Sequence, residues 1–327
     1  MMRDGYGRII DYLRISVTDR CNFRCVYCMP PEGVSLLAHD EILSYEEILR
    51  VVRLLGQHGV SKIRITGGEP LVRKGIVEFI RNVRKIESVK DLAMTTNGSL
   101  LSGMADQLKA AGLDRVNVSV DTVNHERFAD ITGRKHLTEV LAGIRRAVEA
   151  QLTPVKLNVV LTEALWEDDL LYLVEQTYNS PIAVRFIEYM PIGRLGIKPG
   201  LDVAAIKNII NKAGYGCLQE DDAVKGNGPA KYFRLPKAQG VIGFITPISE
   251  HFCPSCNRLR LTADGKIKSC LLLNNEIDIK ACMRGGGSDI ELYELFLKAL
   301  QEKPGRHRLS EGREEDDLTR RMFQVGG

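Results

Sequence analysis

The sequence predicts an α/β fold built on a parallel sheet, and two observations carry this prediction. Six short apolar runs alternate with segments whose apolar residues recur at helical spacing. Strands that alternate with helices form right-handed βαβ units, which build either an open doubly wound sheet or a partial barrel. The periodicity does not choose between these two. The predicted strands are residues 11–17, 62–66, 92–96, 115–120, 155–161 and 182–187.

Five helices are predicted between these strands. The first begins at Ser44, which can form a capping box with Glu47, and it ends before Gly59. Its apolar residues recur every three or four positions, as expected for a helix that packs on a sheet. The other helical patterns are residues 75–86, 102–110, 138–150 and 165–178.

A second, smaller domain is predicted where this regularity weakens, after about Gly214. Two short strand-like runs follow, at residues 240–245 and 258–262. We therefore divide the chain into residues 1–222 and residues 223–327. The charge-dense segment 302–321 is expected to be a solvated helix, and the last five residues a flexible tail.

Composition and charge exclude several classes of protein. The chain has 327 residues, 44% of them hydrophobic and 27% charged, which is ordinary for a globular protein. Its net charge of +3 is too balanced for a nucleic-acid-binding surface. No signal peptide and no run of about 18 apolar residues is present, so we expect no membrane segment and a cytoplasmic location.

Six of the eight cysteines form two triplets, and the first of these is Cys21, Cys25 and Cys28. In a cytoplasmic chain, reduced thiols that bind a metal are favoured over disulfides. The triplet follows the first predicted strand, at the edge of a parallel sheet where ligand sites concentrate. Three thiolates on a four-iron cluster leave one iron open for chemistry. The alternative is a zinc site completed by His39.

The second triplet is Cys253, Cys256 and Cys270. It again offers three thiolates, and its spacing leaves two possibilities open. A fourth ligand from Cys282, Cys217 or His251 would close the site around a structural metal. An open cluster is favoured by the strand that follows, because alternation places Arg258 and Arg260 on one face of it, suited to a phosphate or a carbonyl-rich base.

The motif CNFRCVYC resembles the signature of the radical S-adenosylmethionine (SAM) superfamily, and the later TGGEP resembles its second motif. Further matches run in order along the chain. They are LRISVTDRCNFRCVYCMP, KIRITGGEPLVR, MTTNG, RVNVSVD, VKLNVV, RFIEYM and FCPSCNRLRLTADGK, followed by Cys270 and a Gly-Gly ending. Together they resemble the GTP 3′,8-cyclase family of molybdenum cofactor biosynthesis.

This resemblance implies an incomplete (β/α)6 TIM-like barrel, closed by a C-terminal α+β domain that carries a second cluster. It implies two 4Fe-4S clusters and SAM as cofactors, and GTP as the substrate of a lyase. A 5′-deoxyadenosyl radical would remove H3′ of GTP, and C3′ would then attack C8. The Gly326-Gly327 ending would reach into the active site.

The resemblance also implies roles for individual residues. The expected cluster ligands are the two cysteine triplets. The expected SAM contacts are Tyr27, Gly68, Ser119 and Met190. The expected GTP contacts are Arg14, Arg64, Thr95, Lys156, Arg258, Leu259 and Arg260, and Arg185 is a candidate catalytic residue.

Further expectations concern partners and rivals. The family implies an electron donor such as flavodoxin or ferredoxin, transfer of product to cyclic pyranopterin monophosphate synthase, and a possible homodimer, with no nucleic-acid or membrane partner. One rival is a radical SAM enzyme that modifies a peptide and carries an auxiliary cluster. The other is a non-catalytic zinc or iron-sulfur binding module.

Overall fold

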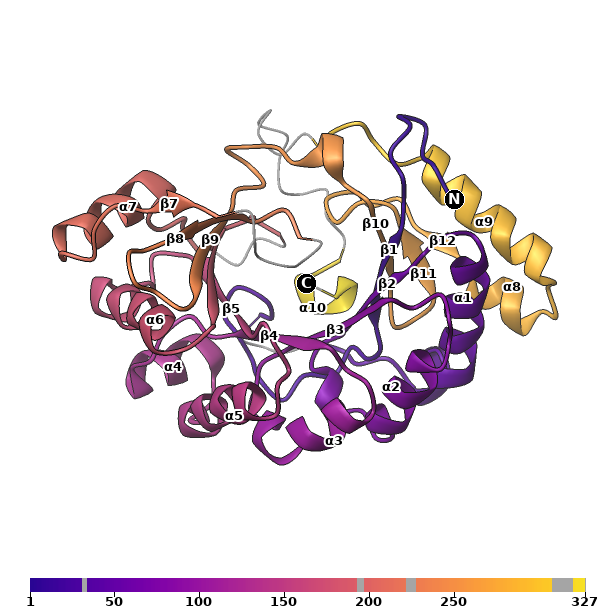
Figure 1. The fold of residues 1–327 in the computed structure, drawn as a ribbon. Helices are drawn as coiled ribbons and strands as arrows, with labels where there is room; N and C mark the ends of the chain where they lie inside the picture. Colours follow the sequence, from indigo (N-terminus) through magenta and orange to yellow (C-terminus); the bar gives the residue numbers. More distant parts are fainter. Residues whose placement is uncertain (31–33, 193–196, 222–227, 308–319, 327) are drawn as a thin grey trace.

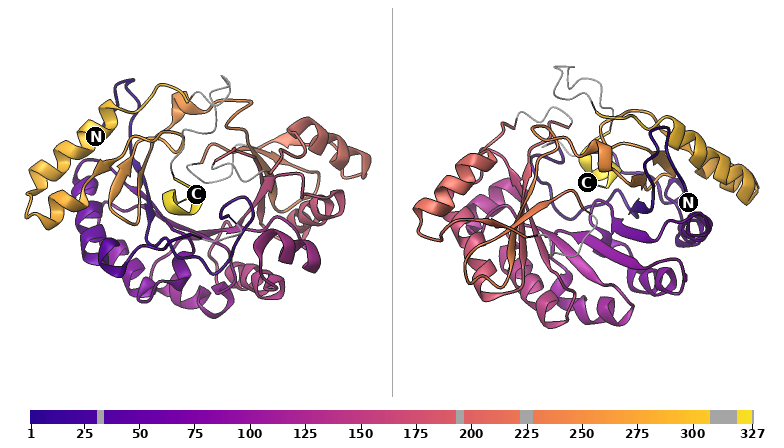
Figure 2. Two further views of the ribbon diagram at one scale, coloured as in Figure 1. Left: turned by 180° about the vertical axis from the view of Figure 1, so that it is seen from behind. Right: turned by 45° about the horizontal axis from the view of Figure 1, so that its top comes forward.

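The computed structural model describes residues 1–30, 34–192, 197–221, 228–307 and 320–326. A strongly curved sheet forms its centre, with helices along the outer, convex face (Figure 1). The C-terminal helix α10 lies instead on the concave side, and the further views in Figure 2 agree. This arrangement is a partial barrel, which settles the choice that periodicity left open.

The six predicted strands are present and pair in parallel in chain order. Most residues of these strands are buried, as expected for parallel strands that are covered by helices on one face. These strands are β1 Tyr12–Ser16, β2 Lys62–Thr66, β3 Asp91–Thr96, β4 Arg115–Ser119, β5 Lys156–Leu161 and β6 Ala183–Glu188.

The later strands extend this sheet at both edges. In spatial order the sheet runs β12-β11-β10-β1-β2-β3-β4-β5-β6-β9-β8-β7. Strand β9 pairs in parallel with β6, and β10 pairs in parallel with β1. The added strands are β7 Gln219–Glu220, β8 Lys231–Arg234, β9 Val241–Ile245, β10 Arg258–Leu261, β11 Lys266–Lys268 and β12 Ile277–Asp278.

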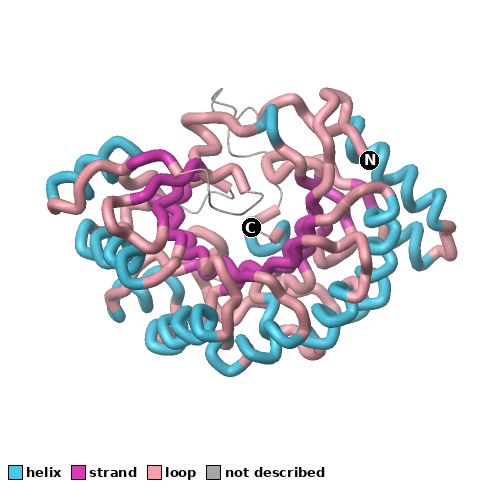
Figure 3. The backbone as a smooth tube through the Cα atoms, in the orientation of Figure 1, coloured by secondary structure: helices cyan, strands magenta, loops and turns pink. Residues whose placement is uncertain are grey.

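The helices cover the convex face with their apolar sides, and Figure 3 shows them as a cyan ring outside the magenta strands. The α-helices are α1 Tyr45–Gln57, α2 Ile76–Arg84, α3 Ala105–Ala110, α4 His125–Thr132, α5 Leu137–Glu149, α6 Glu167–Asn179, α7 Val203–Lys212, α8 Lys280–Arg284, α9 Asp289–Gln301 and α10 Met322–Val325. Short 3-10 turns are η1 His39–Glu41, η2 Pro70–Val72, η3 Leu101–Gly103 and η4 Cys253–Ser255.

The five predicted helices are confirmed, and the capping box of α1 is present. The Ser44 hydroxyl accepts a hydrogen bond from the Glu47 amide, and the Glu47 carboxylate accepts one from the Ser44 amide. Helix α4 was not predicted, although Asn124 caps its start and Gly133 ends it with a positive φ of 65°. None of the described helices is long and apolar enough to cross a membrane.

The expectation for the C-terminal segment was wrong over the part that the structure describes. Residues 302–307 are turns rather than helix, and residues 308–319 lie outside the described residues. The tail is not a frayed end, because Phe323 and Val325 of α10 are buried at 3% exposure each. Burial of these two apolar side chains holds the tail inside the curved sheet. The division at residue 222 stays a prediction.

Candidate active site

Two adjoining cavities occupy the concave side of the sheet. The first has a volume of about 210 Å³ and is lined by the thiols of the first cysteine triplet. The second has a volume of about 190 Å³ and is lined by the thiols of the second triplet. Five residues line both cavities, so the two spaces meet. These shared residues are Thr95, Asn158, Ile187, Met190 and Met322.

The first triplet lies on the loop that follows β1. A turn brings its last two cysteines together, because the Cys28 amide donates to the Cys25 carbonyl at 2.9 Å. Tyr27, between them, donates its hydroxyl proton to Asp121 at 2.6 Å, and the other oxygen of Asp121 accepts from the Val160 amide. Asp121 therefore fixes the cysteine loop to the carboxyl ends of β4 and β5.

The Gly-Gly-Glu-Pro turn after β2 packs directly on this loop. The Gly68 amide donates to the Thr18 carbonyl at 2.7 Å, and a Cβ at Gly68 would lie 2.3 Å from the Arg20 carbonyl oxygen. Glycine is therefore required by the close approach of two backbones. Glu69 is buried and accepts hydrogen bonds from the Thr96 hydroxyl and the Asn97 amide, at 2.7 and 2.6 Å.

Burial makes the thiols of the first triplet hard to ionise on their own. It raises the pKa of Cys21 to about 11, with a further contribution from Glu69, and that of Cys28 to about 12. The pKa of Cys25 is also well raised, first by burial and then by its two neighbouring cysteines. Three half-buried thiols whose pKa values are all raised fit a site where a cationic metal centre stabilises the thiolates.

The four residues expected to contact SAM all line the first cavity. Tyr27 comes from the cysteine loop, Gly68 from the turn after β2, Ser119 from the end of β4, and Met190 from the segment after β6. The sheet thus brings together positions that are far apart in the sequence. Their contacts with SAM stay a prediction.

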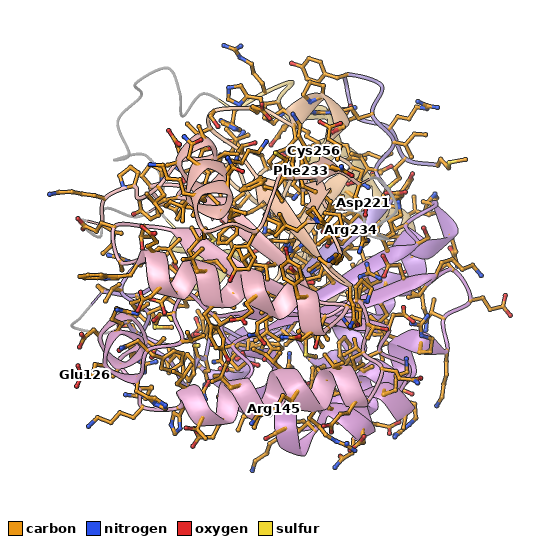
Figure 4. All side chains as sticks on the ribbon, turned by 60° about the vertical axis from the view of Figure 1, so that its left-hand side comes forward. Glu126, Arg145, Asp221, Phe233, Arg234 and Cys256 are labelled. Atoms are coloured by element: carbon orange, nitrogen blue, oxygen red, sulfur yellow. The ribbon has the colours of Figure 1, made fainter. Side chains whose placement is uncertain are left out.

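The second triplet lies beyond the edge of the barrel, on η4 and on the loop after β11. Cys253 and Cys256 begin and follow η4, and the Cys256 amide donates to the Cys253 carbonyl at 3.1 Å. Burial raises the pKa of Cys256, but Arg258 and Lys303 outweigh it and lower this pKa to about 7. Figure 4 shows Cys256 on the opposite side of the molecule from Arg145 of the outer helix α5.

A row of arginines crosses three neighbouring strands. Arg14 on β1 stands opposite Arg260 on β10 and opposite Arg64 on β2. All three line the second cavity, together with Arg258 and Arg185. Burial, and then the charges of Arg260 and Arg64, hold the pKa of Arg14 well below its usual range. Such a cluster of buried cations is unfavourable unless an anion joins it.

No carboxylate lines the second cavity in the part of the chain that the structure describes. The Nε atoms of Arg185 and Arg258 are buried and have no hydrogen-bond partner among the described residues. The Arg258 guanidinium lies over the Phe252 ring, 4.9 Å from its centroid. Buried donors with no internal acceptor indicate a polyanionic ligand in this cavity.

Two of the predicted GTP contacts do not line this cavity. The Leu259 side chain is fully buried in the hydrophobic core on the other face of β10, which leaves only its main chain to face a ligand. Lys156 is buried, and its ammonium lies 3.0 Å from the Tyr232 hydroxyl. Burial, and then the charges of Arg185 and Arg115, lower its pKa to about 6.

The C-terminal tail lies between the two cavities. The Gly326 carbonyl accepts hydrogen bonds from Arg14 at 3.1 Å and from Arg260 at 3.0 Å. The Phe323 amide donates to the Cys28 thiol and partly offsets the rise in its pKa that burial causes. Met322 lines both cavities. The tail therefore contacts both the first cysteine triplet and the arginine row.

The residues predicted as alternative fourth metal ligands lie in different positions relative to the two cysteine triplets. His39 is exposed and does not line the first cavity, which removes the support for a zinc site there. Cys217 is exposed, and Cys282 lies in α8 and does not line the second cavity. His251, Cys253 and His307 have donor atoms within 4.8 Å of one another, so these three could hold a metal ion. His251 therefore remains a possible closing ligand.

Sequence reasoning missed several residues of the site. Tyr12 and Asn158 both line the second cavity. Tyr12 is two positions from Arg14, and Asn158 is two positions from Lys156. Alternation along each strand was therefore the signal that could have found them. His307 also lines this cavity, and its Nε2 lies 2.7 Å from the Pro247 carbonyl oxygen. Asp121 ends the quoted motif RVNVSVD, although no role was assigned to it, whereas His307 stands in no motif and no local signal marks it.

Known proteins resemble this chain in sequence and in fold. The family model "Radical SAM superfamily" matches residues 15–175, and "Molybdenum Cofactor Synthesis C" matches residues 182–309. Among solved structures, SuiB of Streptococcus suis bound to S-adenosylmethionine has a TM-score of 0.64 at 14% identity, over 97% of this chain and 78% of that one. The fold and the sequence models define a radical SAM protein.

Curated relatives identify the family within that class. The GTP 3′,8-cyclase of Pelotomaculum thermopropionicum is 49% identical over the full length of both chains. That of Desulforamulus reducens is 47% identical, and that of Listeria monocytogenes is 44% identical over 100% of this chain and 99% of its own. The chain belongs to the GTP 3′,8-cyclase family.

Proposed function

We propose that this enzyme converts GTP and SAM to 3′,8-cyclo-7,8-dihydro-GTP, 5′-deoxyadenosine and methionine, the first step of molybdenum cofactor biosynthesis. Relatives that carry the name GTP 3′,8-cyclase match the chain from end to end. One observation of the structure carries the substrate assignment: five arginines line a cavity that has no carboxylate among its described residues and that adjoins a second thiol-lined cavity.

The first cavity is the proposed site of a 4Fe-4S cluster and SAM. Its three half-buried thiols come from one loop and offer the donor set of a cluster with one open iron. Tyr27, Gly68, Ser119 and Met190 surround the space beside them and are the proposed SAM contacts. When bound, the cluster and SAM supply a 5′-deoxyadenosyl radical. The chain itself must shield that radical from other hydrogen donors.

The second cavity is the proposed site of the second cluster and GTP. A triphosphate carries the concentrated negative charge that the arginine row requires, and guanidinium groups bind phosphate oxygens in pairs. Arg14, Arg64, Arg258 and Arg260 are placed to hold it, with Thr95 at the junction of the cavities. Lys156 and the main chain of Leu259 are also proposed GTP contacts, although neither residue lines the second cavity.

The junction of the cavities is where the ribose belongs. GTP held by its triphosphate in the second cavity can present C3′ toward the first cavity, past Thr95 and Met190. Fixing the two reacting atoms in this way replaces an encounter in solution by an intramolecular step. Arg185, hydrogen-bonded to Asn158 at this junction, is the proposed residue that orients the base. The tail closes the same region against water.

The proposal extends to partners. Cleavage of SAM needs one electron, so a small electron carrier such as flavodoxin or ferredoxin must reach the first cluster. The cyclised nucleotide is the substrate for cyclic pyranopterin monophosphate synthase, which consumes it in the next step. A homodimer stays a prediction.

The test is an anaerobic reaction of the reconstituted protein with SAM, GTP and dithionite, followed by mass spectrometry. The proposal predicts about eight irons per chain, as two 4Fe-4S clusters require, and both 5′-deoxyadenosine and a cyclised guanosine nucleotide. Cys256→Ser is the matched variant, because it should retain the first cluster and SAM cleavage but lose conversion of GTP.

Two results would contradict the proposal. Formation of 5′-deoxyadenosine without any conversion of GTP, in protein with both clusters, would favour the rival that modifies a peptide. Formation of neither product in fully loaded protein would remove the enzymatic assignment, leaving the metal-binding module.

A further inference from the structure

Lys303 is a buried lysine that contacts the second cysteine triplet from a distant part of the sequence. It follows the end of α9, and its residue exposure is 3%. Its ammonium lies 3.5 Å from the Cys256 Sγ and donates to the Arg258 carbonyl at 2.9 Å and the Ser269 carbonyl at 2.6 Å. These three acceptors match the three N–H groups of a protonated lysine.

The charge of Lys303 has no carboxylate to balance it among the described residues, because its contacts there are two carbonyls and one cysteine sulfur. A buried ammonium needs a nearby anion, since isolation of its charge from water is costly. The anion available at this place is the set of cysteine thiolates. The geometry therefore relates Lys303 to the metal centre rather than to the general stability of the fold.

Lys303 also links the segment that carries Cys256 to the segment that carries Cys270. Arg258 begins β10, two residues after Cys256, and Ser269 immediately precedes Cys270. A second buried cation supports the third cysteine, because Arg8 donates to the Cys253 carbonyl at 2.7 Å and to the Pro304 carbonyl at 2.7 Å. Asp4 pairs with Arg8 and neutralises it. Of these two cations, Lys303 is therefore the one whose positive charge can balance the charge of the cysteine sulfurs.

We propose that Lys303 is a positioning residue of the second cluster, and that its positive charge, held beside the Cys256 sulfur by an N–H contact, raises the reduction potential of that cluster. Hydrogen bonds to ligating sulfurs and nearby positive charge both stabilise the more negative, reduced state of an iron-sulfur cluster. This inference rests on the assignment of the second cluster under the proposed function. It adds a residue that lies outside every cysteine and arginine motif.

The test is a potentiometric titration monitored by EPR on the full-length chain. The substitutions Cys21→Ala, Cys25→Ala and Cys28→Ala form its background, so that only the second cluster contributes. Lys303→Met should shift the midpoint potential to more negative values, whereas Lys303→Arg, which keeps charge and donors, should stay near the parent. Lys298→Met removes the same charge from an exposed position on α9 and should shift nothing.

The outcomes separate the inference from the proposed function. If the parent of this series fails to bind about four irons, the assignment of the second cluster is wrong. If it binds them and Lys303→Met has the potential of Lys298→Met, the role of Lys303 is wrong. Should Lys303→Met lose its iron, Lys303→Gln, which keeps donors without the charge, decides: a lowered potential supports the inference and an unchanged one overturns it.

Discussion

At the scale of single residues, the second cavity is defined by like charges that stand close together. Arg14, Arg64 and Arg260 occupy facing positions on adjacent strands, which lie about 4.8 Å apart in any sheet. Burial, and then the charge of Arg258, lower the pKa of Arg260 to about 10. A fold keeps such an arrangement where a ligand of opposite charge offsets the repulsion between the arginines.

Loss of Arg258 should weaken GTP binding strongly. A hydrogen bond to a charged group contributes about 1.5–3 kcal/mol, so Arg258→Met should raise the Kd for GTP roughly ten- to hundredfold. Equilibrium dialysis with labelled GTP under anaerobic conditions measures this change. Arg145→Met, which removes the same charge from exposed helix α5, is the control. Equal Kd values for the two variants would exclude Arg258 from the phosphate site.

Lys156 should take up a proton when GTP binds. Its pKa of about 6 lies below its usual 10.5, because burial and neighbouring arginines disfavour the charged form. Near neutral pH the lysine is therefore mostly neutral, and added phosphate charge shifts its pKa upward. Calorimetry in buffers of different ionisation enthalpy should detect this uptake, and Lys156→Met should abolish it. The same proton count in both proteins would show that Lys156 does not respond to GTP.

At the scale of elements, the C-terminal tail helps to shape the site that the strands build. Gly326 has a φ of +68°, and a Cβ there would lie 2.6 Å from the Thr66 Cγ2. Its carbonyl occupies donors of Arg14 and Arg260 in the structure. The tail is thus fitted to the arginine row at a position where only glycine avoids both strain and a clash.

Gly326→Ala should release the tail and lower GTP turnover while leaving the barrel folded. The left-handed conformation alone costs an alanine about 1–2 kcal/mol, and the clash with Thr66 adds to this cost. Turnover and the thermal unfolding midpoint should be measured together. Gly286→Ala is the control, since Gly286 has a φ of +83° with no atom within 4 Å of its Cβ position. Unchanged turnover in Gly326→Ala would contradict a role for the tail.

An element could be predicted from the sequence when its signal lies within a few residues, such as a cap or a run of apolar residues. The strands β1 to β6 were predicted to within one residue at every end, because apolar patterning acts over short distances. Helix α4 was missed because its eight residues are mostly polar, although Asn124 and Gly133 mark its ends. Composition alone indicated a flexible tail, because burial of Phe323 depends on tertiary contacts that no local pattern encodes. Only the family resemblance indicated that the Gly-Gly ending reaches into the active site.

At the scale of the whole molecule, the sheet explains why two distant cysteine triplets share one active site. Strands β9 and β10, from the C-terminal part of the chain, attach to the two edges of the N-terminal barrel strands. Pairing of β10 with β1 places the second triplet and its arginines beside the arginine of β1. The motifs could be found from sequence, but this pairing, which joins residues more than 200 positions apart, could not.

Because the two cavities adjoin, we propose that GTP and SAM bind side by side and react directly with each other. The most direct test uses GTP deuterated at C3′ in the anaerobic reaction, with mass spectrometry of the 5′-deoxyadenosine. We expect this product to carry deuterium taken from the ribose. Cyclised nucleotide accompanied by 5′-deoxyadenosine that never contains deuterium would contradict it.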